Sequence, residues 1–236
     1  MKKYYITQIY FTENDERNDE LKRVIEFHKT SEFDKVYYLN EKIYGYDDCD
    51  KIQEVNIGKR LTFNDVFDFV KSEELDGAIF FGNSDMYFNS TIHNVLDIIC
   101  DIPIMYCQLR AEHKTDGTIK IDINSNLYKK GCSQDVWIYH SNFNDKLINT
   151  MDFNFGILGC DNACNNIAYK NGFKLINNPF LIHCIHLHNV EHRVWQKNKI
   201  PRLKLPHTNV LPLSNKNKHK TIACNHYEPN FVDYYD

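Results

Sequence analysis

The sequence lacks the short glycine-rich motifs that mark several common nucleotide-binding and hydrolase sites. It contains no GxxxxGK[ST] phosphate loop, no GxGxxG dinucleotide fingerprint and no GxSxG nucleophile elbow. Glycine itself is scarce, at nine of 236 residues. These absences argue against P-loop NTPases, dinucleotide-dependent dehydrogenases and α/β-hydrolases.

Long apolar runs and basic stripes are also missing. No apolar run approaches the about 20 residues that span a bilayer, and the 28 basic residues are spread among 32 acidic ones, for a net charge of −4. We therefore expect no membrane span and no nucleic-acid partner. The start, MKKYYITQIYF, lacks the apolar segment and cleavage site of a signal peptide. We expect a cytoplasmic protein whose eight cysteines are mostly reduced.

What the first half does contain is an alternation of strand-like and helix-like segments. Strands are predicted over residues 4–11, 35–39, 54–57, 77–81 and 102–109. Helices are predicted for DERNDELKRVIEFHK, after an N-cap at Thr62, and from Thr91 to Cys100. This order predicts right-handed βαβ units. The fold class is α/β, one Rossmann-like domain with a mixed, mostly parallel sheet flanked by helices.

The second half is richer in polar loops. A helix is predicted over residues 163–170, and periodicity fades from Trp195 onward, where four of the six prolines lie. We predict one domain over residues 1–194 and a loop-rich C-terminal arm over 195–236 that packs on it.

The apolar strand ending at Phe81 is followed by Asn83, Ser84 and Asp85. In open α/β sheets, ligands bind beyond the carboxyl ends of strands, so this position predicts that Asp85 faces a ligand. A local role, in which Asp85 only caps the next turn, remains the alternative.

Five short motifs follow one another along the chain: NSDMYF, SQDVW, GCDN, NNP and HLH. Between residues 4 and 193 this order resembles the GT-A nucleotide-sugar glycosyltransferases, in particular small single-domain members found in some large DNA viruses. The resemblance implies a single GT-A domain with a nucleotide-binding half (1–110) and an acceptor half (111–194). It also implies that NSD is a DxD-like motif, in which Asp85 binds the metal ion while Asn83 and Ser84 contact the donor.

The implied function is metal-dependent transfer of a sugar, such as a hexose or deoxyhexose, from a nucleoside diphosphate-sugar donor to a hydroxyl acceptor. The acceptor would be a glycan or a protein-linked sugar, and the metal Mn²⁺ or Mg²⁺. Either ion would stabilise the leaving diphosphate. Two alternatives remain: a metal-dependent nucleotidyltransferase or phosphohydrolase, and a non-catalytic sugar-nucleotide-binding module.

The segment HCIHLHNVEH contains two histidines that are two positions apart, so on a strand they share a face. The resemblance implies that a late histidine completes the metal site, and His188, then His186, are the candidates. A zinc site that also uses Cys160 and Cys164 is a weaker alternative, because no CxxC pair is present. The histidines could also be core residues.

Two aspartates of the second half are candidates for the catalytic base that accepts the proton of the acceptor hydroxyl. Asp161 follows a Gly-Cys turn at a predicted helix start, where it could equally be an N-cap. Asp135 precedes Val-Trp-Ile and could bind the acceptor, replace Asp161 as base, or only begin a strand. Trp137 is predicted to lie in the core.

Further donor contacts are implied near the first two helices. Arg60 is a candidate for the phosphates and Asp65 for the base or ribose, although an exposed ion pair explains Asp65 as well. Thr7, Gln8 and Arg17 lie where GT-A chains meet the nucleotide.

Overall fold

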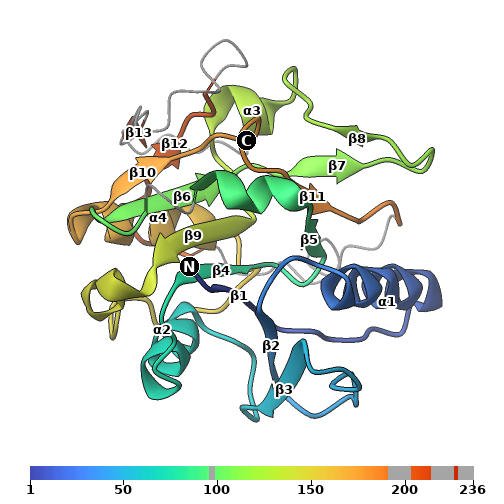
Figure 1. Ribbon diagram of the computed structural model, residues 1–236. Coiled ribbons are helices and arrows are strands. Elements are labelled where there is room, and N and C mark those ends of the chain that lie inside the picture. Colours follow the sequence, from blue (N-terminus) through green and yellow to red (C-terminus); the bar gives the residue numbers. More distant parts are fainter. Residues whose placement is uncertain (96–98, 191–202, 214–225, 228–236) are drawn as a thin grey trace.

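The computed structural model describes residues 1–95, 99–190, 203–213 and 226–227. A seven-stranded sheet in the order β10-β6-β9-β4-β1-β2-β3 forms its centre (Figure 1). Its strands are β1 (Lys3–Thr7), β2 (Lys35–Asn40), β3 (Ile52–Asn56), β4 (Ala78–Gly82), β6 (Ile104–Gln108), β9 (Val136–His140) and β10 (Lys174–Ile176). Neighbours are parallel except in the two pairs that involve β9. The predicted α/β class with a mixed, mostly parallel sheet is confirmed.

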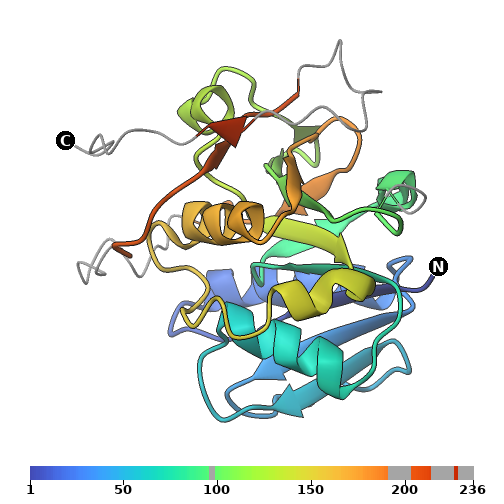
Figure 2. The same cartoon turned by 90° about the vertical axis from the view of Figure 1, so that its left-hand side faces the viewer.

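Helices cover both faces of this sheet. On one face lie α2 (Phe63–Ser72), the 3₁₀ helix η2 (Ser141–Lys146) and α4 (Cys160–Lys170), which stand in front of the sheet in Figure 2. On the other face lie α1 (Asp15–Lys29) and the 3₁₀ helix η1 (Ser90–Val95). Strands β4, β6 and β9 are buried along their whole length, as strands covered on both faces should be. Trp137 is fully buried in this core, as predicted.

Local sequence explains where the first helices begin. The Asn14 side chain accepts a hydrogen bond from the Arg17 backbone N–H at 2.7 Å, and acidic residues follow in the first turn of α1. Thr62 and Asp65 form a reciprocal capping box at the start of α2. The predicted N-cap at Thr62 is confirmed.

A second, smaller sheet lies beyond the carboxyl ends of β4 and β6. Its order is β5-β11-β7-β8, with β5 (Met86–Phe88), β11 (Cys184–His186), β7 (Ala111–His113) and β8 (Ile119–Lys120). Strand β5 follows β4 after three residues, and β7 follows β6 after two. Strand β11 lies between them, antiparallel to β5 and parallel to β7. This sheet brings the late histidines to the end of β4.

Residues 203–213 pack over α4 and the short helix α3 (Asn126–Lys130). The Thr208 N–H donates to the Asn162 carbonyl at 3.0 Å, and the Val210 N–H donates to the Gly131 carbonyl at 3.0 Å. Strand β12 (Asn209–Val210) pairs with β13 (His226–Tyr227). The predicted boundary at residue 194 lies outside the described residues and stays a prediction.

Two predicted elements differ from the structure more than the others do. The first strand ends at Thr7 rather than Phe11, because the Ile9 N–H donates to the Asn40 side chain, at the end of β2, and not to a backbone carbonyl of that strand. The helix expected from Thr91 to Cys100 is 3₁₀ over Ser90–Val95, and residues 96–98 lie outside the described residues. The Asn89 side chain accepts from both the N–H and the hydroxyl of Thr91, which fixes a tight turn at this point.

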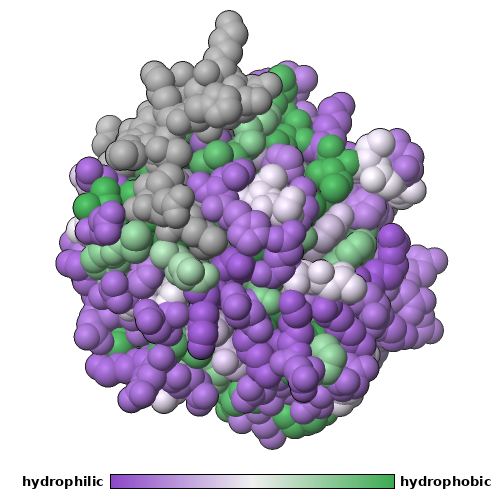
Figure 3. Space-filling view, viewed as in Figure 1, coloured by the Kyte–Doolittle hydropathy of each residue, from purple (hydrophilic) through white to green (hydrophobic). Residues whose placement is uncertain are grey.

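The view of the surface in Figure 3 is mostly hydrophilic, with apolar residues in small separate groups. None of the helices in the described part of the chain combines the length and the apolar composition that crossing a bilayer requires.

Candidate functional site

Asp85 lies in the short connection between β4 and β5, where the central sheet passes into the smaller one. Asp85 is only 8% exposed, so its carboxylate needs compensating partners. Thr7, at the end of β1, donates its hydroxyl hydrogen bond to the carbonyl of Gly82, at the end of β4, at 2.8 Å. The site therefore begins at the edge where β1 and β4 end side by side.

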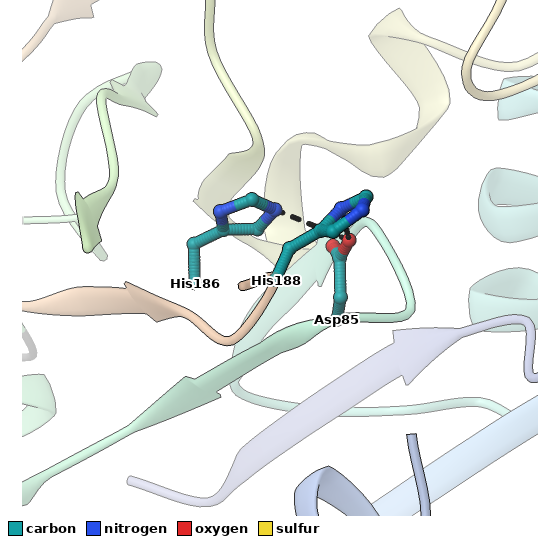
Figure 4. A group of neighbouring side chains, drawn as sticks. All are labelled: Asp85, His186 and His188. Carbon is teal, nitrogen blue, oxygen red and sulfur yellow. Dashed lines mark hydrogen bonds and ion pairs between the residues drawn. The ribbon is translucent and has the colours of Figure 1, made fainter. Parts of the chain in front are cut away.

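The two late histidines face this carboxylate. Strand pairing places His186 opposite Met86, and His188 follows just past the end of β11. Nε2 of His186 lies 3.2 Å and Nδ1 of His188 lies 3.4 Å from Oδ2 of Asp85. Figure 4 shows the two rings converging on this carboxylate. One possible ligand atom from each residue lies within 4.8 Å of the others. The structure thus joins three residues that the sequence analysis proposed as metal ligands.

Arg17 of α1 adds a fixed positive charge to the same carboxylate. Its Nη2 lies 2.6 Å from Oδ2 of Asp85, and its Nη1 lies 2.9 Å from Glu20. Nη1 also donates to the Leu187 carbonyl at 3.1 Å. Glu20 in turn accepts from the N–H groups of Asn189 and Val190. Helix α1 therefore holds both Asp85 and the backbone that carries the two histidines.

A second series of charged contacts leads away from His186. Its Nδ1 lies 3.0 Å from Oε2 of Glu112, whose other oxygen accepts from Nε of Arg110 at 2.7 Å. Nη1 of Arg110 donates to both oxygens of Asp135, at 3.0 and 3.2 Å. Asn83 donates to the same carboxylate at 3.0 Å. Asp135 is therefore engaged by a cation and an amide.

The pKa values of this group reflect the pairing. Burial opposes ionisation of Asp85, but His186, His188 and Arg17 outweigh it and hold the pKa of Asp85 well below its usual range. For His186, burial is outweighed by Asp85 and Glu112, which raise its pKa to about 9. Burial likewise opposes ionisation of Glu112, yet His186 and Arg110 lower its pKa to about 2. At neutral pH the metal-free protein thus holds two carboxylates and an imidazolium here.

Two atoms of the cluster are buried without a hydrogen-bond partner within the described part of the chain: Oδ1 of Asp85 and Nε2 of His188. Buried polar atoms are normally paired, so an orphaned carboxylate oxygen and an orphaned imidazole nitrogen in one cluster indicate a missing ligand. One carboxylate and two imidazoles are a donor set that divalent transition metals favour. The residues therefore fit a divalent cation.

Asp161 lies in the first turn of α4 and differs from Asp135 in its surroundings. Its oxygens accept from the Cys160 thiol at 3.1 Å and from the Gln134 N–H at 3.4 Å. Burial, then the negative charge of Asp135, raises its pKa to about 6. The N-cap of α4 is Gly159, which makes no side-chain cap hydrogen bond, so the capping role considered for Asp161 is wrong. A carboxylate with a pKa near neutrality is suited to proton transfer.

The other proposed donor contacts lie around the same edge of the sheet but make protein contacts of their own. Thr7 is fully buried. Arg60 donates to the Phe155 carbonyl at 2.7 Å. Asp65 takes part in the capping box of α2 and also forms an ion pair with Lys59 at 2.8 Å. Ser84 is buried beside Asp85. Their roles toward a nucleotide stay predictions.

The zinc alternative finds no support among the described residues. Cys160 and Cys164 are buried against the core on α4, and the metal-compatible group found in this part of the chain contains neither. Raised thiol pKa values, caused first by burial, keep both protonated. His192, which belongs to the same histidine-rich stretch, lies outside the described residues.

Three charged residues of the network were not predicted from the sequence: Glu20, Arg110 and Glu112. Arg110, just before β7, and Glu112, within it, are two positions apart, a spacing that indicates a shared side but names no partner. The contact of Glu112 with His186 follows only from the register of β7 against β11, which the sequence does not reveal.

No family model and no curated protein matches the chain. Solved structures give distant similarities. TarS 1–349 of S. aureus in complex with UDP-GlcNAc is 12% identical, with 81% of this chain and 57% of that chain covered and a TM-score of 0.44. A second structure of TarS 1–349 of S. aureus is also 12% identical, with 81% of this chain and 59% of that chain covered and a TM-score of 0.45. HddC from Yersinia pseudotuberculosis is 10% identical, with 61% of this chain and 78% of that chain covered and a TM-score of 0.38. The chain spans under three fifths of the TarS structures, and similarities this distant carry no argument about activity.

Proposed function

We propose that this protein is a metal-dependent glycosyltransferase of GT-A type that moves a sugar from a nucleotide-sugar donor to a hydroxyl acceptor. The observation that carries the proposal is the cluster of Asp85, His186 and His188 at the carboxyl end of β4. This is the edge at which open α/β sheets bind ligands, and the cluster presents two orphaned buried atoms. The ordered motifs from NSD to HLH support the same reading.

Asp85, His186 and His188 would hold the metal ion. Carboxylate oxygen suits Mg²⁺ and Mn²⁺ alike, whereas two imidazoles favour Mn²⁺. The bound ion supplies positive charge that stabilises the departing diphosphate. Arg17 keeps Oδ2 of Asp85 occupied, which supports Oδ1 as the ligand atom.

The remaining residues would bind the donor and move the proton. Asp161 is the base that accepts the proton of the acceptor hydroxyl if the configuration at the anomeric carbon inverts. Its raised pKa supports this choice over Asp135, which Arg110 and Asn83 already engage. Thr7, Arg17, Arg60, Asp65, Asn83 and Ser84 are the proposed donor contacts, directly or, for Arg17, through Asp85.

A thermal-shift screen of nucleoside diphosphates and nucleotide sugars, with and without Mn²⁺, tests donor binding. A ligand at 100 times its dissociation constant should stabilise the fold by about 2.7 kcal/mol, and we expect this shift to need the metal. Product analysis then separates the reactions. A glycosyltransferase releases nucleoside diphosphate, a nucleotidyltransferase releases pyrophosphate, and a binding module releases neither. Either of the last two results would contradict the proposal.

A further inference from the structure

Glu112 lies directly behind the proposed metal ligand His186. The parallel pairing of β7 with β11 sets Glu112 opposite His186, and Oε2 of Glu112 lies 3.0 Å from Nδ1 of the imidazole. We propose that Glu112 is a positioning residue of the metal site, which fixes the ring of His186 so that Nε2 faces Asp85 and the ion. The inference rests on the proposed function and adds a residue to it.

The argument starts from the two nitrogens of one imidazole. A histidine that binds a metal through one nitrogen carries its proton on the other, and an acceptor for that proton fixes both the tautomer and the ring orientation. Carboxylates flank His186 on both sides, Asp85 at Nε2 and Glu112 at Nδ1. With Asp85 as the metal ligand, Glu112 remains as the acceptor for Nδ1–H. The Nε2 lone pair is then directed to the ion.

Glu112 is itself held in place. Arg110 donates from Nε to Oε1 of Glu112 at 2.7 Å and from Nη1 to Asp135. Because the guanidinium is planar, two engaged carboxylates fix its orientation and hence that of Glu112. A carboxylate restrained in this way can restrain the imidazole it contacts.

His188 shows what a histidine without such support looks like. Its Nδ1 lies 3.4 Å from Asp85, and its Nε2 is buried with no hydrogen-bond partner within the described part of the chain. Among the residues that the structure describes, therefore, only His186 of the two proposed histidine ligands has a carboxylate behind it. Glu112 should matter for the contribution of His186 and not for that of His188.

The test uses full-length protein with Glu112→Ala, Glu112→Gln and the exposed-loop control Glu41→Ala. Mn²⁺ binding is measured by calorimetry, unfolding by denaturant titration, and the His186 Nδ1–H proton by ¹⁵N-edited NMR of the metal-free protein. We expect Glu112→Ala to weaken Mn²⁺ binding 10–100-fold, as for other lost supports of metal ligands. Glu112→Gln keeps an acceptor oxygen and should lose less, and Glu41→Ala should lose nothing. The hydrogen-bonded Nδ1–H signal should vanish in Glu112→Ala alone.

Unchanged Mn²⁺ affinity in Glu112→Ala, or a loss of stability with unchanged affinity, would overturn the inference. If the wild type binds no Mn²⁺, the metal-dependent function fails instead, and the NMR signal still decides the role of Glu112. An Nδ1–H signal that persists in Glu112→Ala shows that this carboxylate does not hold the ring.

Discussion

At the scale of single residues, the site is an alternating series of buried or half-buried charges. Negative and positive side chains follow one another in the order Glu20, Arg17, Asp85, His186, Glu112, Arg110 and Asp135. Removing one partner of such a pair leaves an uncompensated charge, at a cost of about 3–5 kcal/mol. Groups of charged residues with strongly shifted pKa values are concentrated at functional sites. Substitutions that test these residues should therefore preserve the shape of the side chain, so that the loss of charge is the main change.

Replacing Asp85 with Asn keeps the shape and removes the charge that the metal ion needs. We expect metal-dependent nucleotide binding to weaken and the transfer rate to fall by about 10²–10³, as when other electrostatic stabilisers are lost. Nucleotide affinity with and without Mn²⁺ measures the effect. Asp76→Asn, an exposed residue just before the other end of β4, is the matched control. A metal dependence that survives in Asp85→Asn would remove Asp85 from the metal site.

Asp161 gives a prediction in pH. Burial and the charge of Asp135 raise its pKa to about 6, so the carboxylate form that can accept a proton predominates above pH 6. Transfer should therefore rise with pH through an apparent pKa of about 6 and then level off. Asp161→Asn should abolish this limb, reduce the rate by about 10²–10⁴ and leave donor binding intact. A variant with normal transfer, or a product with retained configuration, would speak against the role as base.

At the scale of elements, α1 fixes the strand that follows Asp85. His28, near the end of α1, is fully buried, with Nε2 2.8 Å from the Met86 carbonyl and Nδ1 2.8 Å from the Tyr38 hydroxyl. Arg17, eleven positions earlier, contacts Asp85 itself. Two turns of one helix thus restrain two successive residues of the site.

The pH dependence of stability tests this contact. Burial lowers the pKa of His28 to about 4 from 6.5, so the folded state binds its proton less readily than the unfolded chain. The stabilisation by neutral His28 is complete above pH 6.5 and is lost as the pH falls toward 4, by an amount of about 3 kcal/mol. Urea unfolding of wild type and His28→Gln at pH 7.5 and pH 4.5 measures it. The wild type should lose more stability on acidification, and equal losses would exclude His28 as the source.

At the scale of the whole molecule, the segment 203–213 joins parts of the fold that are far apart in sequence. Asn165 on α4 donates to the Thr208 carbonyl at 3.2 Å, and Asn177 after β10 donates to the Val210 carbonyl at 2.9 Å. The backbone of Val210 lies close to Gly131, at the end of α3, and its N–H donates to the Gly131 carbonyl. Asp161, the proposed base, lies on α4, so the segment helps to hold the helix that carries it.

Gly131→Ala tests how much this packing contributes. Gly131 has φ +56°, and an added Cβ would lie 2.5 Å from the Val210 carbonyl oxygen. Gly117 has φ +82° and no atom within 4 Å of such a Cβ, which makes Gly117→Ala the matched control. Both should lose about 1–3 kcal/mol for backbone strain, and Gly131→Ala should lose more because backbone atoms must move. Denaturant unfolding compares them, and equal losses would mean that the segment contributes little.

The sequence by itself determined most helices and strands and named the three residues of the candidate metal site. Alternating strand and helix patterns specify the α/β class, since local periodicity reports which face of each segment is buried. Asp85 was a candidate ligand because it follows the most apolar strand in a motif that resembles DxD. His186 and His188 were candidates because they are two positions apart and because the resemblance implies a late histidine. Only the tertiary structure decided the rest. Arg17 and Asp85 are 68 positions apart, and His186 and Glu112 are 74 apart. Such contacts depend on strand order and register, because packing between distant segments leaves no periodic pattern in the sequence of either one.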